Sequence, residues 1–548
     1  MTDFHKKSIQ SLLSEKRLAE AFAELRQTAQ TLQNWQLNNR LDELEESYKY
    51  MIRYVADGCN DPQREEIHNG ITAKLMELAD ITEQELTVQN SPKLYYETLR
   101  MERKYPRSLE ALLEAYRECA DKTALFYELP ADKRDSDQER TLLMEKEKAA
   151  NAVFKHIWVT FPVTANEAGT LDKLFADADA TAEIKELAMA ATMLSLLEHY
   201  SEHLLLSLLD LYAANAFNDA SLSMKALCCA LIAMHCHRET IKHSSAISLR
   251  IANIADSERG RRDIMTVFLQ FIRSRSTERI SQKVRDELVP KLMKLSPEMR
   301  RKMRDGFSDD IEEMAKNPDW QEMLNESGIT DKMQELSRMQ AEGSDVFLSS
   351  FARLKSFPFF NDVANWFVPF TPRHSSIFRV FAGNSGSMLL SMVDRTGAFC
   401  DSDKFSFALS VATMPDQHRS MMMAQFDEQQ EQVINEMAGS LPNPDKQREN
   451  IANKYVQSLY RFFNLFRSRN DFYNPFSTRL NLIDVPFVSD ALSDTKSLRL
   501  IAEFYFSMQC YTDALSTFGK VLKQDSPTAS DYQKTGSCLF SQLSRPAL

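Results

Sequence analysis

The stretch LRLIAEFYFSMQCYTDALSTFGKVLKQDSP, residues 498–527, carries the clearest structural pattern in this sequence. Each of its two halves places apolar side chains three or four residues apart, and a proline closes the second half. Residues at that spacing share one face of a helix, so each half is predicted to be an amphipathic helix. Three positions of the first helix recur thirty-four residues later, where Leu498, Ala502 and Tyr505 are followed by Tyr532, Gly536 and Leu539. An echo at a fixed period of this length predicts a repeated helix pair.

This pattern resembles the tetratricopeptide repeat, which has large and small residues at the contacts of its two helices and a proline at the turn. Those positions are filled here by Leu498, Ile501, Ala502, Tyr505, Ala514, Phe518 and Val521. The family usually has alanine where Val521 stands. The resemblance covers residues 496–548 and implies a groove lined from the first helix by Lys496, Arg499, Glu503, Phe506 and Ser507. Because Glu503 stands where a carboxylate clamp has asparagine, such a clamp is not implied.

The second repeat stops near the start of its second helix, at residues 547–548. A solenoid repeat cannot bury its apolar face alone, and such arrays end in polar caps. No segment here resembles a cap, so we expect either a longer array or a partner that covers this end.

Composition extends the helical prediction to the whole chain. The 548 residues include 13 glycines, whereas average usage of about 7% would give roughly 38. Strand-and-turn proteins need glycine in tight turns, and the abundant leucine, alanine, glutamate and lysine favour helices. We therefore predict an all-α fold, an α-solenoid of antiparallel helix hairpins. A chain of this length forms roughly two to four domains or one long repeat array.

The sequence carries no recognisable targeting signal. Residues 1–22 are polar and amphipathic and lack the apolar core of a secretory signal. The longest apolar runs, such as ALCCALIAM at 226–234, are shorter than the about 20 residues of a membrane span. The eight cysteines are scattered without a C-x-x-C pair, as is typical of reduced thiols. These features predict a cytoplasmic protein.

Changes in composition divide the chain into six predicted regions: N-terminal helical hairpins at 1–160, a middle helical region at 161–305, a polar helical connector at 306–345, an aromatic and proline-rich irregular insert at 346–415, a further helical region at 416–495, and the tetratricopeptide-like repeats at 496–548. The middle region is similar in its spacing to HEAT-type repeats. Short polar breaks at 215–221, 242–245 and 255–260 separate its helices. In the first region, TEQE at 82–85 fits a capping box that begins a helix at Thr82.

The predicted insert contains the densest aromatic sequence, FARLKSFPFFNDVANWFVPFTPRHSSIFRVF at 351–381. Its three prolines disfavour helix, and AGNSGS at 382–387 suggests a short hairpin. Two interpretations follow: an aromatic plug that seals two helical segments, or an exposed aromatic docking patch.

One motif raises the possibility of a metal site. His199, Glu202 and His203 form the pattern H-x-x-E-H of a class of zinc peptidases, and Glu278 follows at the distance of that class's further ligand. Such enzymes carry the motif in a domain with a sheet, and no strand-rich flank is predicted here. On a continuous helix the three residues lie opposite the apolar stripe and face solvent. We therefore interpret the motif as a polar helix face, with a zinc-dependent hydrolase as the alternative.

A second histidine cluster and a basic segment are further candidates. His235, Glu239 and His243 are spaced to share one helix face as a possible metal site. Residues 238–304 hold 17 basic and 8 acidic side chains, a net charge of +9 in a chain of net −12. Its candidate anion-binding residues are Arg259, Arg261, Arg262, Arg273, Arg275, Arg300, Arg301 and Arg304. The segment is interpreted as a solvated face, a surface for an acidic protein, or a nucleic-acid site.

Together these patterns predict a non-enzymatic scaffold that binds a partner protein or peptide along a helical groove and needs no cofactor. The alternatives are a zinc hydrolase and an anion or nucleic-acid binder. No P-loop, G-x-G-x-x-G or G-x-S-x-G motif occurs in the sequence.

Overall fold

The protein is described from a computed structural model, over residues 6–32, 35–57, 62–88, 91–288, 335, 338–340, 343–381, 399–415, 443–524 and 527–543. These residues form helices joined by turns, and none of them lies in a strand. The predicted all-α fold is confirmed. Among the described helices, none is both long and apolar enough to cross a membrane.

The first four helices build a small unit with its own hydrophobic core. They are α1 (Lys6–Ser14), α2 (Leu18–Thr31), α3 (Trp35–Ala56) and α4 (Arg64–Val88). The apolar stripe of α2 is buried in this core, including Leu18, Phe22 and Leu25. The capping box predicted at Thr82 is wrong, because α4 runs through it. The buried Thr82 hydroxyl donates instead to the Leu78 carbonyl, at 2.7 Å, within the same helix.

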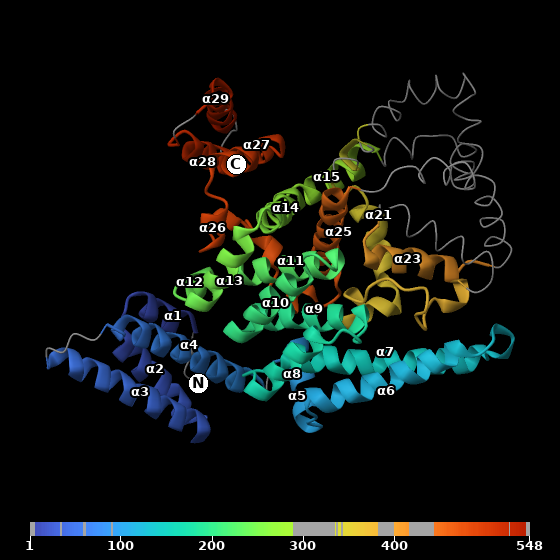
Figure 1. The fold of residues 1–548 in the computed structure, drawn as a ribbon, viewed down its shortest axis with the longest axis horizontal. Helices are drawn as coiled ribbons and strands as arrows, with labels where there is room; N and C mark the ends of the chain where they lie inside the picture. The colour runs from blue at the N-terminus through green and yellow to red at the C-terminus, as the bar shows by residue number, and fades with distance from the viewer. Residues whose placement is uncertain are drawn as a thin grey trace.

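The larger part of the chain is a two-row helical stack (Figure 1). Row A consists of α7 (Ser136–Val159), α9 (Ala182–Glu198), α11 (Ala220–Cys236), α14 (Glu258–Ser274) and α27 (Thr495–Ser507). Row B consists of α6 (Leu109–Glu128), α8 (Ala165–Ala176), α10 (Glu202–Asn215), α13 (Ser245–Asp256) and α26 (Val488–Ala491). Each helix packs against the next member of its row and, in α6–α7, α10–α11 and α13–α14, against its hairpin partner. This arrangement confirms the predicted stack of helix hairpins.

The predicted polar breaks of the middle region each supply the cap of the next helix. The side chains of Asp219, Ser244 and Ser257 accept hydrogen bonds from the first-turn amides of α11, α13 and α14. Such caps satisfy backbone donors that a helix start otherwise leaves free. Helix α11 is packed by α9, α10, α14 and α25 (Pro444–Leu465). Burial on every side explains why residues 226–234 are apolar all round.

The boundary predicted at residue 160 is misplaced. The main core begins near Val88 and contains residues of α5 (Leu94–Lys104), α6 and α7, so the solenoid starts before residue 100. Sequence periodicity could not separate the two cores, because both consist of amphipathic helices of similar length.

The main core also holds residues of later helices, among them α25 and α27. Helix α14 is followed by α15 (Thr277–Lys283), and α25, much later in the sequence, packs across α11 and α14 of row A. Row A then resumes with α27, which packs on α14. Helices close together in the stack are therefore separated by more than two hundred residues of sequence.

The aromatic segment fills the space between α7 and α25. The Phe367 ring lies 5.9 Å from the Phe154 ring of α7 and 4.8 Å from the Phe462 ring of α25. Phe359, Phe360 and Trp366 are also buried, which supports the plug interpretation. Within residues 353–381 the helical elements are four short 3-10 turns, at Arg353–Ser356, Pro358–Asn361, Ala364–Trp366 and Phe378–Phe381.

Two parts of the regional prediction are wrong. Residues 401–412 form a regular helix, α23 (Asp401–Ala412), inside the predicted irregular insert. Within the predicted helical region 416–495, residues 466–487 are irregular, with 3-10 turns over Arg469–Asp471, Pro475–Ser477 and Leu482–Asp484. The predicted hairpin at 382–387 and most of the predicted connector at 306–345 lie outside the described residues.

Candidate functional site

The H-x-x-E-H motif spans a break between two helices. Helix α9 ends at Glu198, His199 is in extended backbone, and α10 begins at Glu202. The His199 side chain is buried and its ring stacks on Phe161, with 4.4 Å between ring centroids. The prediction of one continuous, solvent-facing helix is therefore wrong at His199. The break puts this imidazole into the core, where it lies against the rings of Phe161 and Tyr95.

The other two residues of the motif have separate partners. His203 is half exposed and its Nε2 lies 2.9 Å from the Asp172 carboxylate. The Glu202 carboxylate accepts a hydrogen bond from the Ser244 hydroxyl at the start of α13. Glu278, in the first turn of α15, accepts a hydrogen bond from Gln282. Among the described residues, no three His, Cys, Asp or Glu side chains are grouped as metal ligands.

The second histidine cluster is also divided by the backbone. Helix α11 ends at Cys236, and α12 (Arg238–Ile241) carries Glu239 but stops before His243. His235 is buried beside the Thr478 hydroxyl, at 3.3 Å. Burial lowers the pKa of the His235 imidazole, with a further contribution from the positive charge of Arg238. The predicted shared helix face is therefore wrong, and a neutral, buried His235 serves packing.

The candidate anion-binding arginines that lie within the described residues contact other parts of the same protein. Arg262 pairs with Asp445 at 2.9 Å and Arg273 with Glu449 at 3.5 Å, so both join α14 to α25. Arg261 donates to the backbone carbonyl of Ala255, and the Arg259 guanidinium lies 5.0 Å from the Phe217 ring centroid. In these contacts the guanidinium groups interact with carboxylates, a backbone carbonyl and an aromatic ring of the same protein. Arg300, Arg301 and Arg304 lie outside the described residues.

Arg275 belongs to the junction between the solenoid and the C-terminal helices. These are α27, α28 (Tyr511–Val521) and α29 (Ala529–Leu543), which pack in sequence. The Arg275 guanidinium donates to Asp513 of α28 at 2.8 Å, and Arg479 approaches the other oxygen of this carboxylate at 3.6 Å. Arg279 donates to the Gln509 side chain at 2.8 Å. The Asp513 carboxylate is therefore shared between two guanidinium groups, those of Arg275 and Arg479.

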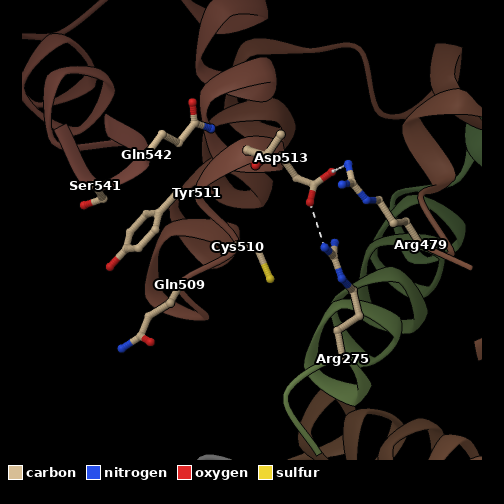
Figure 2. Close-up of a pocket in the computed structure, with 9 residues that line it drawn as sticks. Arg275, Arg479, Gln509, Cys510, Tyr511, Asp513, Ser541 and Gln542 are labelled. Atoms are coloured by element: carbon tan, nitrogen blue, oxygen red, sulfur yellow. Dashed lines mark hydrogen bonds and ion pairs between the residues drawn. The ribbon is translucent and has the colours of Figure 1, made fainter. Parts of the chain in front are cut away.

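A polar cavity of about 380 Å³ opens beside this junction. Figure 2 shows Asp513 between Arg275 and Arg479, with Cys510 and Tyr511 along the wall. The remaining lining residues are Gln509, Thr512, Ser541 and Gln542. Burial raises the pKa of the Cys510 thiol, so the thiol is protonated near neutral pH and is not an activated nucleophile. The cavity offers hydrogen bonds, but its arginines are already paired.

The groove residues predicted on the first repeat helix are divided between two roles. Arg499 pairs with Asp531 at 3.0 Å and Glu503 with Lys534 at 2.7 Å, so both of them join α27 to α29. The Phe506 ring packs edge-on against Tyr511 of α28, 5.7 Å away. Lys496 and Ser507 are exposed.

The outer face of α29 is the side of this helix that points away from α27, and it includes Tyr532 and Leu539. The side chain of Tyr532 is 58% exposed and that of Leu539 is 46% exposed. Asp531 and Lys534 are the charged residues of this helix, and both point toward α27, where they form the ion pairs described above. Between positions 532 and 540 the exposed residues of this helix carry no charge and are partly apolar: Tyr532, Gln533, Gly536, Ser537, Leu539 and Phe540. The sequence echo at residues 532–539 lies on this helix, whereas the predicted groove residues lie on α27.

Comparison with known proteins finds no matching family model, no matching curated protein and no matching solved structure.

Proposed function

We propose that this chain is a non-enzymatic scaffold that binds a partner protein through its C-terminal helices. The observation that carries the proposal is the uncharged outer face of α29, at the end of the described stack, where the large apolar side chains of Tyr532, Leu539 and Phe540 are exposed. Exposed apolar surface of this kind is typical of interaction sites. The tetratricopeptide-like pattern of residues 496–548 agrees with a role in protein recognition.

The middle of the stack is less suited to the groove binding that the sequence suggests. There the surface of α11 and α14 is covered by α25, and the aromatic segment fills the space beside α7. A partner would have to displace buried side chains, among them Trp366 and Phe462. Binding at the C-terminal end requires no such displacement.

The proposal is tested by affinity capture with the full chain, with and without nuclease. We expect one or a few proteins at stoichiometric yield, resistant to nuclease and competed by untagged chain. Recovery that disappears with nuclease would instead support nucleic-acid binding. One equivalent of bound zinc, lost in His203→Ala together with a hydrolytic activity, would overturn the proposal in favour of an enzyme.

A further inference from the structure

Helix α5 joins the N-terminal unit, helices α1–α4, to the stack. That unit has its own core, whereas the buried Tyr95 and Leu99 of α5 belong to the main core. Helix α5 packs against both α4 and α7, and it lies where the N-terminal unit meets the stack (Figure 1). Arg103 of α5 pairs with Glu85 of α4 at 2.8 Å. A change in how α5 is held on the stack is therefore passed on to α4.

The C-terminal end of α5 is held by a histidine that lies between two carboxylates. His156 is in the last turn of α7, and its Nδ1 lies 3.5 Å from the Glu102 carboxylate of α5. Its Nε2 lies 3.2 Å from the Glu167 carboxylate of α8. All three side chains are at most 20% exposed. One imidazole ring thus contacts an acid of a different helix through each of its nitrogens.

The two acids depend on His156 to different extents. Glu167 is in the first turn of α8, where the helix dipole favours a negative charge. Glu102 is in the last turn of α5, where the dipole disfavours one. The Oε2 atom of Glu102 is also buried, and no described residue donates a hydrogen bond to it. At 3.5 Å its contact with the ring is an ion pair, which exists only while the imidazole is charged.

The environment of His156 favours the charged ring at neutral pH. Burial by itself lowers the pKa of the imidazole, but the contact with Glu102 and the negative charge of Glu167 outweigh burial, so that the pKa is raised. An imidazolium donates from both nitrogens, whereas a neutral imidazole donates from one. The neutral ring keeps its N–H at Nε2, toward the closer Glu167, and then presents a lone pair to Glu102. Loss of the proton therefore weakens the contact with α5 before the contact with α8.

Other elements that pack against α7 do not supply a competing charge to His156. These are α6, α9 and the aromatic segment. Their titratable groups interact at other positions along α7: Tyr127 donates to Glu139, Glu183 pairs with Lys146, Asp362 pairs with Lys155, and His374 lies 3.6 Å from Glu147. The acids that act on His156 are thus Glu102 and Glu167.

We infer that His156, Glu102 and Glu167 form a pH switch at the junction between the N-terminal unit and the stack, in which the protonated His156 holds the C-terminal turn of α5 against α7 and deprotonation releases it. A group with a raised folded-state pKa stabilises fully below its unfolded pKa of about 6.5 and loses that effect as pH rises through the folded value. The switch is accordingly closed in mildly acidic solution and opens on the alkaline side. The Arg103–Glu85 pair carries the change to α4.

Hydrogen exchange of the full chain, followed by mass spectrometry, tests this inference. Exchange is measured at pH 6 and pH 8.5, and each rate is divided by the intrinsic rate at the same pH, so that the general pH dependence of exchange cancels. Protection of peptides that cover residues 98–105 should fall by at least about threefold at the higher pH, the size expected for the loss of one partly buried ion pair. Protection of α8 should change less.

Two variants and a matched control assign the effect to the switch. Glu102→Gln removes the charge that requires the imidazolium, so protection of α5 should no longer change with pH. His156→Gln should show the lower protection of α5 at both pH values. The control is His203→Gln, which removes a histidine–carboxylate pair that is half exposed, with Asp172 at 2.9 Å. It should keep the pH dependence of α5 that wild type shows.

The comparison with Glu102→Gln decides the outcome. Burial raises the pKa of Glu147 to about 7, so this carboxyl titrates in the same range, but it is present in wild type and in every variant. A pH dependence of α5 that persists in Glu102→Gln would overturn the inference. Constant protection of α5 in wild type would also overturn it, as would a loss in α8 equal to that in α5. If His156→Gln does not fold, Glu102→Gln still decides, because its side chain is partly exposed and keeps its size.

Discussion

Replacing Arg461 with methionine should be among the most destabilising single substitutions in this chain. The Arg461 guanidinium, from α25, donates to Asp345 at 2.8 and 3.0 Å and lies 2.8 Å from Asp403 of α23. Lys355 lies 3.0 Å from the same Asp403 carboxylate. All four side chains are at most 3% exposed. Two positive and two negative charges therefore meet in a site that is almost fully buried, and a third positive charge, that of Lys454 in α25, interacts with the same two carboxylates.

The magnitude follows from the partner that the substitution removes. Arg461→Met removes the guanidinium that donates to Asp345 and lies against Asp403, and removal of one partner from a buried ion pair costs about 3–5 kcal/mol. A second substitution, Asp345→Asn, removes the carboxylate charge that loses both of its hydrogen bonds from Arg461. The double variant should therefore be more stable than Arg461→Met alone, although still less stable than wild type.

The assay is urea unfolding followed by circular dichroism, with all four members of the double-mutant cycle. The matched control is Arg250→Met, which breaks the exposed pair with Asp210 and should cost at most about 1 kcal/mol. A loss for Arg461→Met as small as that of the control would refute the reasoning. So would a double variant whose destabilisation equals the sum of the two single ones.

Three further predictions concern single positions. Burial raises the pKa of the Glu147 carboxyl to about 7, so its folded-state pKa exceeds the unfolded value and stability is lost as pH rises through 7. The unfolding free energy of wild type relative to Glu147→Gln should fall by up to about 3 kcal/mol between pH 5 and 8; a constant difference across urea titrations would contradict this. Gly260→Ala should lower the free energy of unfolding by about 1–3 kcal/mol, because the new Cβ would lie 1.9 Å from the Ile254 carbonyl oxygen. An unchanged melting temperature would show that the neighbouring backbone moves away without loss of stability. His199→Ala should lower the free energy of unfolding by about 2–3 kcal/mol, because it removes a ring buried against aromatic neighbours. His203 is half exposed, so His203→Ala should change the free energy of unfolding by at most about 0.5 kcal/mol. Equal losses of stability in thermal unfolding would argue against these two environments.

The fold class was predictable because it depends on local patterns. Helical spacing and polar breaks are read within a few residues, and the breaks that contain Asp219, Ser244 and Ser257 supplied the caps that the structure shows. The tertiary path was not predictable in this way. Helix α25 is an ordinary amphipathic helix in sequence, and only the fold shows that Arg448 donates to Asp263, 185 residues away, at 2.8 Å.

Helix continuity was the main source of error at the candidate sites. The spacing of His199 and His203 indicates a shared face only if the helix runs between them, and it breaks after Glu198. Ser201 is the residue that marks the break, since its hydroxyl accepts from the Leu204 amide as an N-cap. A serine followed by an acid at the first helical position was therefore a readable signal. It competed with an apolar periodicity that runs through both helices and favoured one long helix.

The basic segment shows why a local surplus of charge is a poor guide to an external ligand. Counting residues 238–304 alone gives a net positive charge, because the acidic partners come much later in the sequence. Asp445 pairs with Arg262 and Asp513 with Arg275, across 183 and 238 residues. A solenoid that is interrupted and then resumed needs attachment points between its early and late parts, and complementary charges on α14, α25 and α28 provide them. The pairs that the structure describes thus turn part of the local surplus into contacts between early and late helices. A charge reversal at Asp513 should accordingly loosen α28 from α14, which hydrogen exchange in residues 495–543 would detect as faster exchange than in wild type.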